Sequence, residues 1–168
     1  LAALELLLSL DASAARVLDA ASDVLGAVRT APASALKRPV ALIGPAGSGK
    51  TRAAVAAVTL LAEVLAPCRA VALRANPRAA RIPGEHALVL ERVVRDAGYL
   101  NAARVLAGHT ADVGSSMDPR LVVLVGDAQY CDELSLGRIL GLAETGLARV
   151  VLTLREGAVA PARAKIVT

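Results

Sequence analysis

Aromatic side chains are nearly absent from this sequence. Its 168 residues include no Phe and no Trp, and two Tyr, Tyr99 and Tyr130. A hydrophobic core must therefore be packed from Leu, Val, Ile and Ala, and the length is sufficient for one domain with such a core. The two tyrosines are open to either of two interpretations, stacking on nucleic-acid bases or packing at the rim of the core.

Cysteine and histidine are also scarce. Cys68 and Cys131 have no CxxC neighbour and no supporting group of histidines, which argues against a zinc site or a disulfide framework and fits a reducing compartment. His86 and His109 are isolated in the sequence, and we expect surface or loop positions for both. The sequence therefore argues against a metal–thiolate site.

No segment of the sequence has the length and composition of a membrane span. There is no run of 18 apolar residues and no basic region followed by a cleavage site. We expect a cytoplasmic protein with no membrane contact. The chain begins with Leu1 rather than Met and stops at Thr168 within an apparent element, so we expect it to be a fragment of a longer protein.

The net charge of +4 comes almost entirely from arginine. Lys37, Lys50 and Lys165 are the lysines among 19 basic residues, and the pI is near 9.6. A basic chain favours a polyanionic partner, but an Ala- and Arg-rich composition can equally reflect biased coding. Both interpretations stay open on composition alone.

A phosphate-binding loop motif occupies residues 44–51. Its sequence, GPAGSGKT, fits the P-loop pattern G-x-x-x-x-G-K-[ST]. It follows an apolar segment of strand length, Val40–Ile43, and precedes a helical pattern, Arg52–Ala66, that Pro67 ends. Strand, glycine-rich loop and helix are the context that the motif requires, so we expect the chain to bind a nucleoside triphosphate, ATP, with Mg²⁺.

Each residue type in the loop has a physical role. Glycines allow unusual backbone dihedrals and a close approach to phosphates, while the helix N-terminus presents N–H groups and a positive dipole end to the anion. Lys50 is expected to reach the β- and γ-phosphates, and the Thr51 hydroxyl to bind Mg²⁺. The expected nucleotide-binding residues are Gly44, Pro45, Ala46, Gly47, Ser48, Gly49, Lys50, Thr51 and Arg52.

Strand and helix patterns alternate through the rest of the chain. The expected strands after the P-loop strand are 70–73, a β-branched run starting at 121, and 149–154; the expected helices are 1–10, 14–29, 85–96, 99–107 and 132–145. This alternation predicts an α/β fold, a RecA-like P-loop NTPase with an open parallel sheet and helices on both faces. We divide the chain into an N-terminal helical segment and linker, 1–37, and the P-loop core, 38–168.

Ligands of such sheets bind beyond the carboxyl ends of the strands, where Lys50, Thr51, Asp127 and Arg155 are all expected. Asp127 follows the apolar run LVVLVG, and the sequence allows three roles for it. It can hold Mg²⁺ as a Walker B acid, although Ala128 then stands where a water-activating Glu often follows. It can instead sense the γ-phosphate, or be a solvated strand-end residue. We predict catalytic roles for Lys50, Asp127 and Arg155, and Mg²⁺ binding by Thr51 and Asp127.

The chain resembles superfamily 1 DNA helicases, in particular the RecD-like branch, over most of its length after residue 40. Segment 44–51 is similar to motif I, LRANPRAAR at 73–81 to the DNA-contacting motif Ia, and LVVLVGDAQ at 121–129 to motif III. VVLTLRE at 150–156 is similar to the approach to motif IV, with Arg155 as its γ-phosphate arginine. The resemblance implies an ATP-dependent DNA helicase motor, single-stranded DNA contacts by Arg74, Arg78 and Arg81, and a second RecA-like domain in cis or in trans.

The chain also departs from that family pattern. Motif II, an apolar strand ending in Asp-Glu, is expected before Gly126, where segment 111–118 has neither an acidic pair nor a preceding strand. Gln129 stands one residue earlier than motif III requires. The alternatives are an AAA-type, DNA-associated regulatory ATPase whose Walker B segment is 121–129, with Gly126 and Asp127 in place of its Asp-Glu pair, and a non-catalytic nucleotide-binding module.

Overall fold

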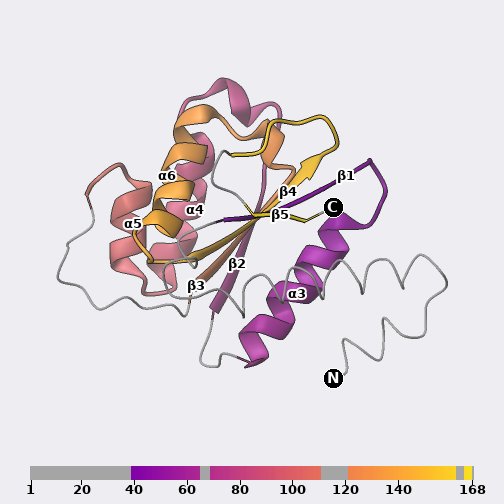
Figure 1. Cartoon of the computed structure of the whole chain (residues 1–168). Helices are drawn as coiled ribbons and strands as arrows, with labels where there is room; N and C mark the ends of the chain where they lie inside the picture. The colour runs from indigo at the N-terminus through magenta and orange to yellow at the C-terminus, as the bar shows by residue number, and fades with distance from the viewer. Residues whose placement is uncertain (1–38, 65–68, 111–120, 162–164, 168) are drawn as a thin grey trace.

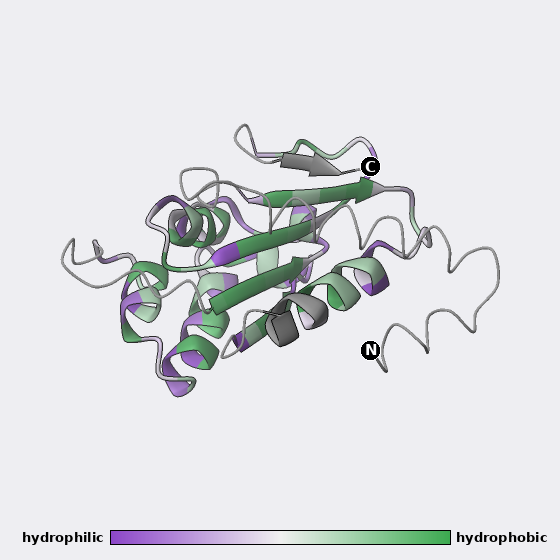
Figure 2. Ribbon diagram, turned by 60° about the horizontal axis from the view of Figure 1, so that its bottom comes forward, coloured by the Kyte–Doolittle hydropathy of each residue, from purple (hydrophilic) through white to green (hydrophobic). Residues whose placement is uncertain are grey.

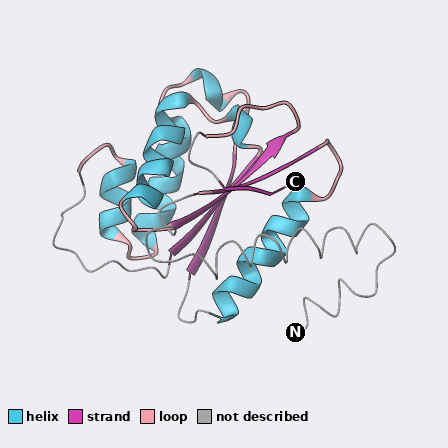
Figure 3. Cartoon of the chain, viewed as in Figure 1, coloured by secondary structure: helices cyan, strands magenta, loops and turns pink. Residues whose placement is uncertain are grey.

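The computed structural model describes residues 39–64, 69–110, 121–161 and 165–167. Its strands are β1 (Val40–Gly44), β2 (Arg69–Arg74), β3 (Leu121–Gly126), β4 (Arg149–Arg155) and β5 (Lys165–Val167). Its helices are α3 (Lys50–Val64), α4 (Glu85–Asp96), α5 (Leu100–Leu106) and α6 (Glu133–Glu144), with short 3₁₀ turns η1 (Ala79–Arg81) and η2 (Ala128–Tyr130). Figure 3 shows the strands in the middle of the molecule with helices on both sides.

The strands form one sheet in the order β2-β3-β4-β1-β5, and all four pairings are parallel. β4 therefore lies between β1, which leads into the P-loop, and β3, which leads to Asp127. In a parallel sheet all carboxyl ends meet at one edge, and ligands of open α/β sheets bind there. The segments that follow β1, β2, β3 and β4 are thus neighbours at this edge.

Helix α3 covers one face of the sheet, and α4 and α6 cover the other, with α5 packed against α4 and α6 (Figure 1). Strand residues alternate between the two faces. Val123, Val125 and Leu152 belong to the core beneath the three helices, together with Leu90, Val94, Leu106, Ile139 and Leu142 from those helices. Figure 2 shows the central strands as the most hydrophobic part of the chain.

Aliphatic packing of this kind matches the shortage of aromatics. The largest fully buried side chains are all Leu, Ile or Val. On the opposite face α3 contributes small residues, Ala53, Ala54 and Ala57, which are nearly inaccessible to solvent. Small side chains let the helix that follows the P-loop approach the sheet closely, so the P-loop itself is held against the strand ends.

The α/β fold with a parallel sheet and helices on both faces is confirmed by this arrangement. The helix expected over residues 85–96 has those bounds in the structure, and Gly98, with a φ of 92°, follows it in the left-handed conformation typical of a helix end. The three strands expected after the P-loop strand are also present. Strand β5 was not expected, and the predicted helices 1–10 and 14–29 lie outside the described residues. Within the described part of the chain, no helix has both the length and the apolar character needed to cross a membrane.

Candidate nucleotide-binding site

The P-loop connects β1 directly to α3, as the motif predicts. Gly47 and Gly49 have φ angles of 76° and 85°, in the region that side chains with a Cβ rarely adopt. At Gly44 the constraint is space, because an added Cβ would lie 3.0 Å from the Ser48 Oγ. The backbone path therefore favours glycine at positions 47 and 49, and a side chain at position 44 would have to displace the Ser48 hydroxyl.

The helix that follows the loop has a strongly positive first turn. It holds Lys50 and Arg52, and the first turn of α3 has no acidic residue. The Lys50 Nζ donates to the Pro45 carbonyl oxygen at 2.6 Å, so the ammonium is held against the loop. With the helix dipole and free N–H groups at the same end, this surface fits a phosphate anion. Thr51 is exposed beside it, with a hydroxyl suited to a hard cation such as Mg²⁺.

Asp127 lies at the carboxyl end of β3 in an unusual backbone conformation. Its φ of 52° makes it the one non-glycine residue with positive φ among the described residues. Its backbone N–H donates to the Thr153 Oγ1 of β4 at 2.9 Å, and its carboxylate is 3.3 Å from the Arg74 Nε at the end of β2. Strained backbone held by neighbouring strands is common at functional sites. The Asp127 backbone is thus held by β4 and its carboxylate by Arg74 of β2.

Arg155 ends β4 directly beside the P-loop strand. It is opposite Gly44 in the β1–β4 register, and its backbone N–H donates to the Gln129 Oε1 at 3.2 Å. Its guanidinium lies 5.6 Å from the centre of the Tyr130 ring, a cation–π arrangement. Tyr130 therefore packs against a candidate site arginine, and Arg155 reaches over η2 from the strand next to β1.

Sheet order changes the interpretation of segment 121–129. If the segment were motif III, a separate strand ending in an acidic residue, motif II, would be expected before it. Segment 111–118, the position expected for motif II, lies outside the described residues. β3 pairs directly with both β2 and β4, so no further strand separates it from either neighbour. It is the third strand along the described part of the chain and carries the strand-end acid Asp127, as the Walker B interpretation of 121–129 requires.

Arg74 ends β2, Arg78 and Arg81 follow the strand, and all three are exposed. They border the same edge of the sheet as the P-loop, since β2 is parallel to β3. Arg74 pairs with Asp127, while Arg78 immediately precedes η1 and Arg81 is its last residue. The three predicted nucleic-acid contacts thus form an exposed basic border around the end of β2.

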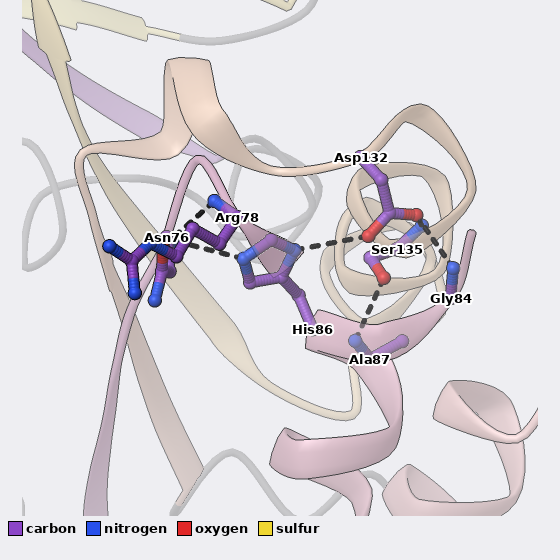
Figure 4. Close-up of polar contacts among 7 residues, drawn as sticks. All are labelled: Asn76, Arg78, Gly84, His86, Ala87, Asp132 and Ser135. Atoms are coloured by element: carbon purple, nitrogen blue, oxygen red, sulfur yellow. Dashed lines mark hydrogen bonds and ion pairs between the residues drawn. The ribbon is translucent and has the colours of Figure 1, made fainter. Parts of the chain in front are cut away.

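A buried polar network holds this basic segment in place (Figure 4). His86 is 3% exposed, and its Nε2 accepts a hydrogen bond from the Asn76 backbone N–H at 3.0 Å. Because Nε2 accepts, the ring proton is on Nδ1, which donates to the Asp132 Oδ2 at 3.1 Å. The surface or loop position expected for His86 is therefore wrong: tertiary packing buries it as a link between the segment after β2 and the start of α6.

Asp132 is the centre of that network. Its Oδ1 accepts from the backbone N–H groups of Gly84 and Ser135, both at 2.8 Å, and the Ser135 Oγ accepts from the Ala87 N–H at 2.8 Å. Burial alone would raise the pKa of the Asp132 carboxyl, but the hydrogen bonds from Gly84, Ser135 and His86 outweigh burial and hold the pKa well below its usual value. The sequence contained one sign of this role, an Asp at the start of a helical pattern, where an N-cap residue is preferred.

The same cluster includes Cys131, and His86, Cys131 and Asp132 offer ligand atoms within 4.8 Å of one another. A metal on the His86 Nδ1 would move the ring proton to Nε2, where the Asn76 N–H already donates, so two donors would face each other. Burial raises the pKa of the Cys131 thiol to about 12, with a further increase from the nearby Asp132 carboxylate. The cluster fits a structural hydrogen-bond network and does not fit a metal centre.

Comparisons with known proteins add little to this geometry. No family model matches the sequence, and no curated protein matches it. The solved structure of Trip13 from Rhizobiales aligns with a TM-score of 0.46 and 19% identity, over 88% of this chain and 57% of that chain. This chain thus spans little more than half of that protein, and we draw no functional argument from a likeness at this level. The fold of this chain is nevertheless defined by its own P-loop and its own sheet order. The chain has a P-loop NTPase-like fold.

Proposed function

We propose that this domain binds Mg-ATP and hydrolyses it slowly, as an AAA-type regulatory ATPase with its Walker B segment at 121–129. The observation that carries the proposal is the sheet order. It places the P-loop, Asp127 and the end of β4 at one edge, with the Asp127 strand separated from the P-loop strand by β4 alone. In the helicase interpretation, segment 121–129 would be motif III and a further acid-bearing strand would precede it.

The residues at this edge of the sheet would have different roles in phosphoryl transfer. The loop N–H groups and Lys50 would bind the β- and γ-phosphates, and Thr51 with Asp127 would hold Mg²⁺, directly or through water. Mg²⁺ would supply charge neutralisation on the phosphates. Arg155, opposite Gly44 in the register, would contact the γ-phosphate from within the domain.

Turnover by the 168-residue chain is expected to stay below about 1 s⁻¹, because phosphoryl transfer depends on charge stabilisation and an assay of this chain alone adds no group from a second domain.

Asp127→Asn should weaken the Mg²⁺ dependence of ATP binding. The measurement is steady-state phosphate release, with calorimetric titration of ATP with and without Mg²⁺. Rapid turnover would contradict the first expectation, and binding with no hydrolysis at all would identify a non-catalytic nucleotide-binding module.

A DNA helicase motor is the second candidate, favoured by the exposed arginines that follow β2. Such a motor would need a second RecA-like domain in cis or in trans. Arg78 and Arg81 have exposed side chains, and the segment that leads into η1 is held by the partly buried hydrogen bond from the Asn76 N–H to His86. An ordered basic border of this kind would suit the phosphates of single-stranded DNA.

Replacing Arg78 and Arg81 together by Ala tests this second candidate. If both bind DNA phosphates, single-stranded DNA affinity should fall, and the slope of log affinity against log salt should decrease in magnitude by about 1.4, or roughly 0.7 for each phosphate that is no longer neutralised. Arg74 is left unchanged because it pairs with Asp127. The matched control replaces Arg69, at the opposite end of β2, and Arg92, on α4; equal reductions in both variants would show a general charge effect only.

A further inference from the structure

The sequence offered no obvious carboxylate besides Asp127 near the P-loop, but the fold places one there. Glu156 immediately follows β4, and its backbone N–H donates to the carbonyl oxygen of Gly44, the first P-loop residue, at 3.0 Å. The side chain is exposed and makes no ion pair with any described residue. An exposed acid is therefore anchored by its backbone to the start of the phosphate-binding loop.

Position in the sheet separates the roles of the two acids. Neighbouring strands lie about 4.8 Å apart, so Glu156, which follows the strand next to β1, starts roughly 5 Å from the P-loop strand, and Asp127, which follows β3, starts roughly 10 Å from it. Asp127 is also paired with Arg74, while Glu156 has no such partner among the described residues. Asp127 is suited to Mg²⁺ held through water, whereas the exposed Glu156 side chain can turn toward the loop without breaking an ion pair with a described residue.

We propose that Glu156 is the carboxylate that orients and deprotonates the attacking water. This proposal rests on the proposed ATP hydrolysis. As the water oxygen forms its bond to the γ-phosphorus, the Glu156 carboxylate accepts a water proton. The bond between the γ-phosphorus and the bridging oxygen breaks, with its electron pair leaving on ADP, and the proton then passes from Glu156 to the released phosphate. ATP and water thus give ADP and inorganic phosphate, and the carboxylate is regenerated.

The test compares Glu156→Gln with the wild-type chain and with Glu133→Gln, a matched change at an exposed acid on α6. Single-turnover phosphate release from Mg-ATP should slow by roughly 10²- to 10⁴-fold in Glu156→Gln, the usual contribution of a general base. Mg-ATP binding should persist. Removing a negative charge beside the γ-phosphate should also tighten ATP relative to ADP by roughly threefold or more, since like charges at short range repel. Glu133→Gln should change neither quantity.

The outcomes separate this proposal from the function on which it rests. If the wild-type chain fails to bind Mg-ATP, the proposed function is wrong and the role of Glu156 is rejected with it. If the chain binds and hydrolyses ATP, and Glu156→Gln does so at the wild-type rate, Glu156 is not the base while the proposed function stands. If the wild-type chain binds ATP but shows no hydrolysis, it is a non-catalytic nucleotide-binding module, and the role of Glu156 as a base is rejected with the proposed hydrolysis. An unchanged ratio of ATP to ADP affinity in Glu156→Gln would also overturn the proposal, because it would show that no carboxylate lies beside the γ-phosphate.

Discussion

Lys50→Ala is expected to weaken Mg-ATP binding by about tenfold or more, or roughly 1.4 kcal/mol and above. The lysine follows a loop in which Gly47 and Gly49 have positive φ, and its ammonium already lies against that loop through the Pro45 carbonyl. Replacing it by Ala removes the positive charge that would face the β- and γ-phosphates. The measurement is calorimetric titration of ATP in the presence of Mg²⁺.

The control for this variant is Arg92→Ala, which removes one positive charge from the exposed surface of α4 on the opposite face of the sheet. It should leave ATP affinity unchanged, and both variants should unfold at urea concentrations close to that of the wild type. Wild-type affinity in Lys50→Ala would show that the loop does not hold a triphosphate, and the proposed function would then be wrong.

Asp132→Ala is expected to cost roughly 3 kcal/mol or more in the free energy of unfolding. The substitution removes the N-cap of α6, typically about 1 kcal/mol, and leaves the buried N–H of Gly84 and the Nδ1–H of His86 without an acceptor, at about 1–3 kcal/mol each. Urea unfolding followed by circular dichroism measures the change. Glu133→Ala, at the exposed neighbouring position, should stay within about 0.5 kcal/mol of the wild type.

The same carboxylate predicts a pH dependence of stability. The pKa of Asp132 is lower in the folded chain than the usual value near 3.9, so its contribution is complete at neutral pH and is lost as the pH falls below about 4. The stability difference between the wild type and Asp132→Asn should therefore be constant above about pH 5 and shrink in more acidic solution. A difference that stays constant down to pH 3 would show that the carboxylate is not stabilised by these hydrogen bonds.

The hydrogen bonds of Asp132 also hold the segment that carries the exposed arginines Arg78 and Arg81. Asp132 bonds to Gly84 and His86, and His86 bonds to Asn76, so the segment after β2 is fixed by the N-terminus of α6. Loss of Asp132 should release this segment even where the sheet remains folded. The network thus has a structural role that reaches the surface where Arg78 and Arg81 lie.

The sequence by itself determined the P-loop and the alternation of strands with helices. Both depend on local chemistry: the glycines and Lys50 stand within eight residues, and the apolar period over residues 85–96 predicted α4 with the bounds that the structure has. The run of β-branched residues in β3 likewise predicted a strand buried on both faces, and all six of its residues are buried.

Only the tertiary structure decided which strand lies beside which, and with that the arrangement of the acids. The pairs that define the site join residues far apart in the chain: Arg74 with Asp127, His86 with Asp132, and Gly44 with Glu156. Hydrophobic periodicity shows which face of an element is buried, but it contains no information on strand order or register. Glu156 went unrecognised for this reason, because its position beside the P-loop exists only once β4 pairs with β1.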